Sequence, residues 1–94
     1  MSFKLGRLLM TRGISERISK DLGFSQFIVK SFERHCNGDW GELCEEDKEL
    51  NELAVRNGDD RIFSRYDYGE DEEPIYIITE WDRSATTILF ASEY

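Results

Sequence analysis

The stretch IYIITEWDRSATTILF, residues 75–90, decides the fold of this chain. Two runs rich in β-branched and aromatic residues flank a short polar connection, Asp82 to Ala85. Strand-forming runs joined in this way are typical of an antiparallel hairpin. We therefore expect the hairpin to lie at the centre of the structure.

The segments on either side of the hairpin predict further strands. Residues Arg61 to Tyr68 alternate, with Ile62 on one side and Phe63 on the other, which predicts a strand. Gly69 to Pro74 then forms the turn into the hairpin, and its four consecutive carboxylates predict a solvated, mobile loop. Residues Phe3 to Thr11 alternate loosely and predict a short strand at an edge of the sheet.

Helical spacing follows the first strand. We expect Ser15 to cap a helix that runs to Leu22 and is ended by Gly23. We expect Ser25 to cap a second helix, whose apolar positions continue to Cys36. Both helices have an apolar side that can pack on the sheet.

A third helix is predicted between Glu45 and Asn57-Gly58. Its first turn contains three carboxylates, where the helix dipole favours negative charge, and the glycine closes it. Glu52 and Arg56 are spaced for an ion pair four residues apart. Its predicted apolar stripe consists of Leu50, Leu53 and Ala54.

These elements predict an α+β fold. It has an N-terminal strand, two to three short helices and a C-terminal antiparallel three-stranded meander, so that a three- to four-stranded sheet packs on helices. The chain has 94 residues, of which 39% are apolar. That composition supports one modest core, and we expect a single domain over residues 1–94.

Charge is distributed unevenly along the chain, whose formal net charge is −8. Residues 1–34 contain seven Lys or Arg against three Asp or Glu, whereas residues 35–94 contain five against seventeen. An acidic body repels phosphate and attracts basic surfaces. The pattern therefore predicts a protein partner with a basic surface and no direct binding of nucleic acid.

The two cysteines, Cys36 and Cys44, fit neither a disulfide framework nor the spacing of a zinc site. With His35 they give at most three soft ligands, two of them adjacent in sequence, so we expect no metal and no cofactor. Lys4 and Arg7 interrupt the apolar N-terminal run, which excludes a signal peptide, and no stretch is long enough to span a membrane. We expect a cytoplasmic protein.

Catalytic candidates are few. His35 could form an acid–base pair with Asp39, but no nucleophile stands in a recognisable setting. A helix-end histidine satisfied by the helix dipole or a carboxylate is the simpler interpretation. Glu80 and Asp82 are spaced as neighbours on one strand face and could hold a divalent ion, although pairing with arginines across the sheet explains them as well. We therefore expect that the protein is not an enzyme.

The segment Gly38-Asp39-Trp40-Gly41 predicts a tight turn that presents one large aromatic side chain. Trp40 either folds over the helix ends as a lid on the core or stands exposed as an anchor for a partner. Carboxylates are frequent after this turn and in the loop before the hairpin. The candidate partner-binding residues are Asp39, Trp40, Glu42, Glu45, Glu46, Glu49, Glu52, Glu70, Asp71, Glu72 and Glu73.

The chain contains the motifs Thr11-Arg12-Gly13, Arg34-His35, Gly38-Asp39-Trp40-Gly41, Glu46-Asp47, Asn51-Glu52, Ile77-Ile78-Thr79-Glu80, Asp82 to Thr87, Leu89-Phe90 and Glu93-Tyr94. Together these motifs resemble a family of small bacterial proteins, many of them carried on plasmids and prophages. The chain departs from the family pattern at Trp81, where a small residue is more usual, and at Ala91-Ser92, where a proline commonly precedes the final Glu-Tyr. Some members are labelled as type I restriction–modification subunits, but this chain is too short for a methyl-donor site and a target-recognition domain. The resemblance implies a mobile-element setting and supplies no catalytic residues.

Charge and resemblance together predict a small acidic, non-enzymatic binding protein of a mobile element. Its expected role is to inhibit or modulate a host nucleic-acid-processing or defence complex, in the manner of anti-CRISPR or antirestriction proteins. One alternative is an accessory or regulatory module that acts through an apolar patch or as a homo-oligomer, and the oligomeric state is left open. A third is a small metal-dependent hydrolase or nuclease built on Glu80, Asp82 and His35.

Overall fold

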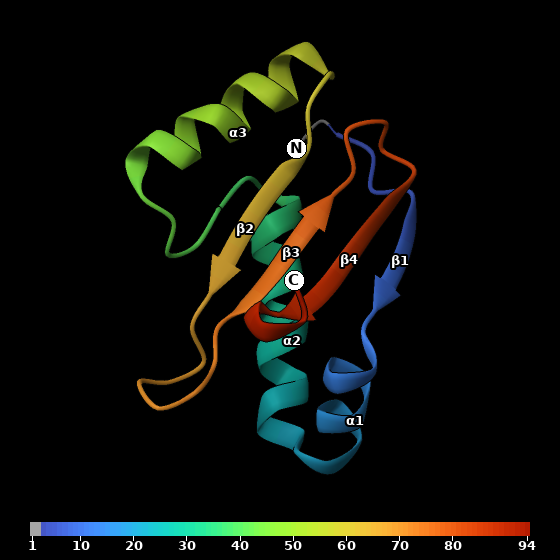
Figure 1. Ribbon diagram of the computed structural model, residues 1–94, viewed down its shortest axis with the longest axis vertical. Coiled ribbons are helices and arrows are strands. Elements are labelled where there is room, and N and C mark those ends of the chain that lie inside the picture. The colour runs from blue at the N-terminus through green and yellow to red at the C-terminus, as the bar shows by residue number, and fades with distance from the viewer. Residues whose placement is uncertain (1–2) are drawn as a thin grey trace.

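The computed structural model describes residues 3–94 and has an α+β fold (Figure 1). Its four-stranded sheet has the order β1-β4-β3-β2, in which β1 is parallel to β4 and the other pairs are antiparallel. The predicted fold class is confirmed, including the N-terminal strand at an edge. The elements are β1 (Arg7–Met10), α1 (Arg12–Lys20), α2 (Leu22–Cys36), α3 (Glu45–Asn57), β2 (Ile62–Tyr66), β3 (Ile75–Thr79), β4 (Ala85–Phe90) and a 3-10 turn, η1 (Ala91–Glu93).

The β3–β4 hairpin forms the middle of the sheet, as the sequence predicts. Ile77 lies opposite Ile88, and Thr79 lies opposite Thr86. On β2 the side chains alternate between buried and half-buried. This alternation arises because successive side chains of a strand point to opposite faces, and helices cover only one face here.

Helices α1 and α2 pack on one face of the sheet, and α2 passes behind the strands in Figure 1. The main core lies between these helices and the hairpin. Phe27, Phe32 and other half-buried apolar side chains close its margins. Its buried members are Ile14, Phe24, Ile28, Tyr66, Ile75, Ile77 and Ile88.

Helix α3 lies on the β2 side of the sheet (Figure 1). A second, smaller core of Trp40, Ala54 and Ile62 joins it to the rest of the protein. The side chain of Asn51 forms two hydrogen bonds with the backbone of Phe63: its Nδ2 donates to the carbonyl oxygen at 2.6 Å, and its Oδ1 accepts from the N–H at 3.1 Å. These bonds fix α3 against β2.

The predicted apolar stripe of α3 is correct for Ala54 and wrong for its two leucines. Leu50 and Leu53 are exposed, whereas Asn51 and Ala54 are buried. Hydrogen bonds from Asn51 to the edge of β2 set the rotation of the helix about its axis, which turns the two leucines outward. A polar side chain thus occupies the position that hydrophobic spacing assigned to leucine.

The starts of α1 and α2 also differ from the prediction. Thr11 caps α1 and Asp21 caps α2, each through a side-chain oxygen that accepts a backbone N–H. Ser15 and Ser25 lie inside the helices and donate their own N–H groups to the carbonyls of these caps, at 3.0 Å in both cases. Gly23 lies in the first turn of α2. Threonine and aspartate are also good N-cap residues, and here they come directly before the helical residues.

Glu93 in η1 connects the last residues to the start of α1. Its carboxylate accepts hydrogen bonds from Thr11 Oγ1 at 2.6 Å and from the Gly13 N–H at 3.2 Å. This contact places Tyr94 beside Tyr76, with 5.8 Å between the ring centres. Tyr94 therefore lies on the sheet face that α1 and α2 leave uncovered.

Candidate binding face and groove

Trp40 is buried, so its interpretation as an exposed partner anchor is wrong. Its side chain is 3% exposed and packs with Ala54 and Ile62. Its Nε1 donates to the Glu52 carboxylate at 2.7 Å. Among the described residues Glu52 forms no ion pair with Arg56. Trp40 and Glu52 therefore hold α3 in place, in agreement with the lid interpretation.

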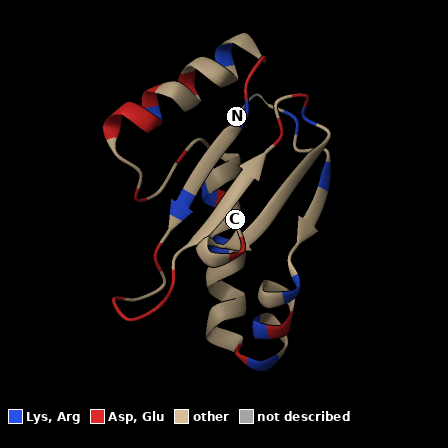
Figure 2. Ribbon diagram, viewed as in Figure 1, with Lys and Arg blue, Asp and Glu red and all other residues tan. Residues whose placement is uncertain are grey.

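The other candidate carboxylates fall into two groups on one side of the molecule (Figure 2). One group lies at the beginning of α3 and in the segment before it, and the other lies in the Gly69–Pro74 loop. Strand β2 runs between them and carries Arg65, which pairs with Asp67 at 3.0 Å. A basic side chain therefore interrupts the acidic surface.

Several of these carboxylates have partners within the protein. Asp39 pairs with Arg34 at 2.8 Å, and hydrogen bonds from that guanidinium hold the pKa of Asp39 below its ordinary value. In the acidic loop, Glu72 pairs with Arg17 at 2.6 Å and Glu73 accepts from the backbone of η1. These carboxylates stabilise the local structure, so they contribute less charge to a binding surface.

Two sets of carboxylates are exposed with little compensation: Glu70 and Asp71 of the loop, which form no ion pair within residues 3–94, and those at the beginning of α3. Glu42, Glu46 and Glu49 form no ion pair within residues 3–94, and Glu45 has one long contact with Lys48 at 3.7 Å. Their negative potential is therefore directed to solvent. We call these four residues the acidic helix face: Glu45, Glu46 and Glu49 lie on α3, and Glu42 lies just before it.

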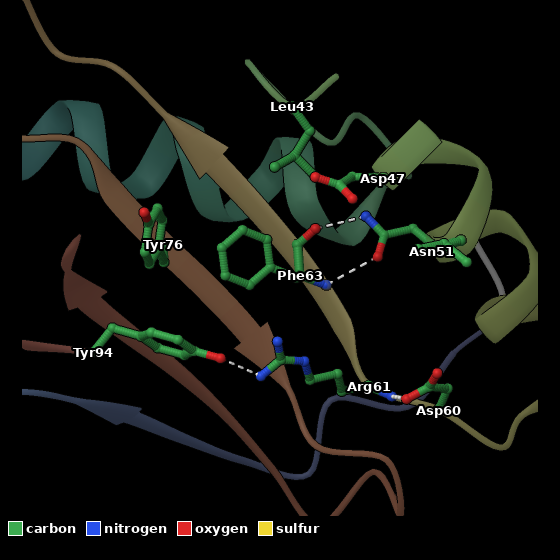
Figure 3. A pocket seen from close by; sticks show the side chains of 9 residues that line it. Leu43, Asp47, Asn51, Asp60, Arg61, Phe63, Tyr76 and Tyr94 are labelled. Carbon is green, nitrogen blue, oxygen red and sulfur yellow. Dashed lines mark hydrogen bonds between the residues drawn. The ribbon is translucent and has the colours of Figure 1, made fainter. Parts of the chain in front are cut away.

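A groove of about 320 Å³ opens beside the acidic helix face, between α3 and the uncovered face of the sheet (Figure 3). Its volume falls at the lower end of the range for ligand sites. Side chains from α3, β2, β3 and the last residue of the chain converge on it. Its lining residues are Leu43, Asp47, Leu50, Asn51, Asp60, Arg61, Phe63, Tyr76 and Tyr94.

Three aromatic rings form one wall of the groove. The ring centres of Phe63 and Tyr76 are 4.7 Å apart, and the Tyr94 ring stands nearly perpendicular to both. The guanidinium carbon of Arg61 lies 5.7 Å from the centre of the Phe63 ring and 5.6 Å from that of Tyr94. Arg61 also donates to the Tyr94 hydroxyl. These distances lie within the range of cation–π interactions.

His35 is fully buried and Asp39 pairs with Arg34, so the acid–base pair that the sequence left possible does not form. Its Nδ1 contacts Ser64 Oγ, and its Nε2 lies 2.9 Å from Thr79 Oγ1. Hydroxyl groups of the sheet therefore satisfy the ring, in place of the expected carboxylate or helix dipole. Burial lowers the pKa of His35 to about 4.

Glu80 and Asp82 lie in the β3–β4 turn, so the prediction that they share a strand face is wrong. Asp82 Oδ1 accepts from the Ser84 N–H at 3.0 Å, and Arg83 donates to backbone carbonyls instead of pairing across the sheet. Nowhere in residues 3–94 do three or more His, Cys, Asp or Glu side chains gather as a metal-binding group. The pair that the metal-dependent alternative requires is not present in this geometry.

Sequence reasoning missed the groove. The sequence offered one signal of it: the alternation of β2 places Phe63 on the side opposite Ile62, and so on the face that carries the groove. The return of Tyr94 over β3 depends on the distant contact between Glu93 and Thr11, and no local pattern indicates it.

No protein-family model, no curated protein and no solved structure matches this chain. The resemblance to plasmid- and prophage-borne proteins therefore stays a prediction. None of the helices within residues 3–94 combines the length and the apolar character that crossing a membrane requires.

Proposed function

We propose that the protein is a small non-enzymatic binding protein that docks on a basic surface of another protein. The supporting observation is the acidic helix face, whose exposed carboxylates adjoin a groove with an aromatic wall. Uncompensated charge steers a basic partner toward this side, and the groove supplies buried contact area. The groove takes the anchoring role that the sequence assigned to Trp40.

The partner class that we propose is a host nucleic-acid-processing or defence complex. Proteins of this class bind phosphate groups through clusters of lysine and arginine. An acidic surface can occupy such a cluster and compete with nucleic acid. The resemblance to mobile-element proteins supports this choice, and inhibition or modulation is the expected effect.

The experiment that tests this function is a salt titration of binding. The partner is captured from host extract, purified, and its affinity measured by calorimetry from about 50 to about 500 mM NaCl, over which the screening length falls severalfold. We expect the affinity to fall by at least about tenfold, as for interfaces with several charge contacts. An affinity that does not change with salt would contradict the proposal.

Charge variants distinguish an effect of the acidic helix face from an effect of the protein's net charge. The variant Glu46→Gln/Glu49→Gln removes two carboxylates from this face and should weaken binding. The matched control Glu16→Gln/Glu33→Gln changes the net charge equally on α1 and α2, where the residues are also exposed. Equal effects of the two variants would mean that the acidic helix face is not the docking surface.

Strand β1 favours a second candidate function, binding through an apolar edge. Leu8, Leu9 and Met10 are between 39% and 46% exposed, and within the described residues β1 pairs only with β4. Exposed apolar edge strands readily pair with another chain. If the protein acts as a homo-oligomer through this edge, light scattering at high concentration will show a dimer or larger species, and Leu9→Lys will dissociate it.

A further inference from the structure

We propose that the groove beside α3 receives an arginine side chain of the partner protein. The inference rests on the proposed function, because it names the group by which a basic partner enters the groove. The groove joins an aromatic wall to two carboxylates, Asp47 and Asp60. Aromatic faces and carboxylates are the two kinds of group that bind guanidinium in proteins.

The protein's own Arg61 shows that the wall accepts a guanidinium. It lies over Phe63 and Tyr94 at 5.7 and 5.6 Å and hydrogen-bonds to the Tyr94 hydroxyl. In the described part of the chain it forms no ion pair with a carboxylate. Ring contacts and a hydroxyl thus hold this cation without a salt bridge.

Arg61 fills only one end of the groove. In Figure 3 its side chain lies toward Tyr94, whereas Asp47 and Leu43 lie on the other side of the groove, near Asn51 and the Phe63 ring. Asp47 is exposed and has no ion-pair partner among residues 3–94. An incoming guanidinium between the Asp47 carboxylate and the Phe63 ring can therefore bind without displacing Arg61.

Leu50 supplies the apolar contact for the rest of the incoming side chain. It lines the groove and is 61% exposed. The methylene stem of an arginine would cover such a surface while its charged head reaches the carboxylate. Burial of both apolar surfaces favours binding.

The chemistry of the groove selects against other ligands. Arg61 is a cation in the groove, but Asp47, Asp60 and the acidic helix face outnumber it, so the net negative potential still disfavours an anion. A neutral apolar group would desolvate the two carboxylates without compensation. Lysine carries a compact, strongly hydrated charge, whereas guanidinium is planar, weakly hydrated and able to stack on a ring and bridge a carboxylate. We therefore expect a preference for arginine.

The test uses the intact chain and a small probe, N-acetyl-arginine methylamide. In an NMR titration we expect saturable shifts of the Asp47, Asn51, Phe63 and Tyr76 amides. The lysine analogue should bind at least about threefold more weakly, and the citrulline analogue, which has nearly the same shape and no charge, should cause no saturable shift. Equal shifts with arginine and citrulline, or shifts away from the groove, would overturn the proposal.

A pair of variants distinguishes binding in the groove from general attraction of the probe to the negatively charged protein. Asp47→Asn should weaken binding of the arginine probe at least about fivefold, as expected for loss of one charge-assisted contact. Glu33→Gln removes an exposed carboxylate from α2, which does not line the groove, and should leave the affinity within about twofold. Both side chains are exposed, so neither change threatens folding. Equal weakening by the two variants would overturn the groove assignment.

The outcomes also separate this inference from the proposed function. If arginine binds in the groove but salt and charge variants leave partner binding unchanged, the groove assignment holds and the docking proposal fails. If partner binding depends on the acidic helix face but the arginine probe shows no saturable shift, the docking proposal holds and the groove assignment fails.

Discussion

His35 belongs to a chain of hydroxyl groups that crosses the sheet. Thr86 Oγ1 donates to the carbonyl oxygen of Leu5 at 2.7 Å, so in its contact with Thr79 at 2.8 Å it accepts. The Thr79 hydroxyl therefore donates to Thr86 and accepts a hydrogen bond from His35 Nε2 at 2.9 Å. The Nδ1 atom then lacks a proton and accepts from Ser64. The network is thus complete with a neutral imidazole, and burial of the ring disfavours the charged form.

The first prediction concerns pH. Burial lowers the pKa of His35 to about 4 from 6.5, so between these values the unfolded chain binds a proton that the native protein excludes. The free energy of unfolding should therefore be constant above about pH 6.5 and fall by about 3 kcal/mol as the pH decreases to 4. Urea denaturation at a series of pH values measures this slope.

Carboxylates with lowered pKa values do not obscure the effect of His35 above about pH 5. The pKa of Asp39 is lowered by hydrogen bonds from Arg34, and that of Asp21 by the Phe24 N–H and then by Arg17. Against the effect of burial, hydrogen bonds from Thr11 and backbone N–H groups lower the pKa of Glu93. The stability that these carboxylates contribute is therefore lost only as the pH falls below about 5. A direct control is the imidazole NMR signal of His35, which should not titrate above about pH 5 in the native protein. A stability that is flat from pH 7 to 4.5, or a native His35 that titrates near 6.5, would refute the assignment.

At the scale of elements, Arg83 joins the β3–β4 turn to the end of α3. It adopts a left-handed backbone conformation with φ of 61°. Its guanidinium donates to the carbonyl oxygens of Asp60 at 2.6 Å, Ala54 at 2.8 Å and Glu80 at 3.1 Å. Because Ala54 lies in the last turn of α3, this cation also complements the helix dipole.

The second prediction separates the side chain of Arg83 from its backbone. Arg83→Ala should lower the free energy of unfolding by about 2–3 kcal/mol, because carbonyl groups lose a charged donor while the strained backbone remains. Arg83→Gly loses the same bonds but relieves the positive φ, so it should be less destabilising by about 1 kcal/mol. Chemical denaturation of both variants tests the order. A glycine variant less stable than the alanine variant would contradict this account.

The outer edge of β2 is closed by side-chain and loop contacts. Asn51 satisfies the N–H and carbonyl of Phe63. Two residues further along, the Arg65 carbonyl accepts from the Glu42 N–H at 2.8 Å, and the Arg65 N–H donates to the Trp40 carbonyl at 3.3 Å. At Phe63 and Arg65 this edge therefore has no free backbone N–H or carbonyl group to pair with another strand, in contrast to β1.

The third prediction follows from this closure. Asn51→Leu keeps a similar volume but leaves the backbone groups of Phe63 without their partners, which should cost about 2–4 kcal/mol of stability. It should also expose the β2 edge and promote self-association. Thermal unfolding with light scattering measures both effects. Stability within about 0.5 kcal/mol of the wild type would show that these hydrogen bonds do not fix α3.

At the scale of the whole molecule, local periodicity predicts the hairpin, the strand around Ile62–Tyr66 and the limits of α3. It fails where distant backbone sets the structure. Trp40 is buried because the following Gly41 lies directly on β2, where a Cβ atom would stand 1.9 Å from the Arg65 carbonyl oxygen. The sequence shows a tight turn between glycines, but not the strand against which the turn packs.

The candidate site, like the fold, can be predicted from the sequence only in part. Composition predicts an acidic body, and the exposed glutamates of the acidic helix face agree with it. The helix dipole and capping preferences do not reveal which carboxylates are bound to arginine, because Arg34 and Arg17 belong to α2 and α1. The groove requires α3, the sheet and Tyr94 to meet, and that arrangement depends on contacts between distant residues.

The last prediction concerns the balance of charge over the whole protein. The chain carries twenty Asp or Glu and twelve Lys or Arg, and the described residues form six ion pairs. Salt weakens those pairs, which destabilises the protein, but it also screens the repulsion among unpaired carboxylates, which stabilises it.

Repulsion should be the larger effect, because the ion pairs are exposed or half-exposed and each contributes at most about 1 kcal/mol, whereas the acidic helix face and the acidic loop gather like charges. Raising NaCl from about 10 to about 150 mM should therefore increase the free energy of unfolding by about 0.5–1 kcal/mol. The variant Glu46→Gln/Glu49→Gln should be more stable than the wild type at low salt and gain less from added salt. A wild-type stability that decreases over this range would mean that the ion pairs dominate, and the negative potential on which partner binding depends would then be too weak for the proposed function.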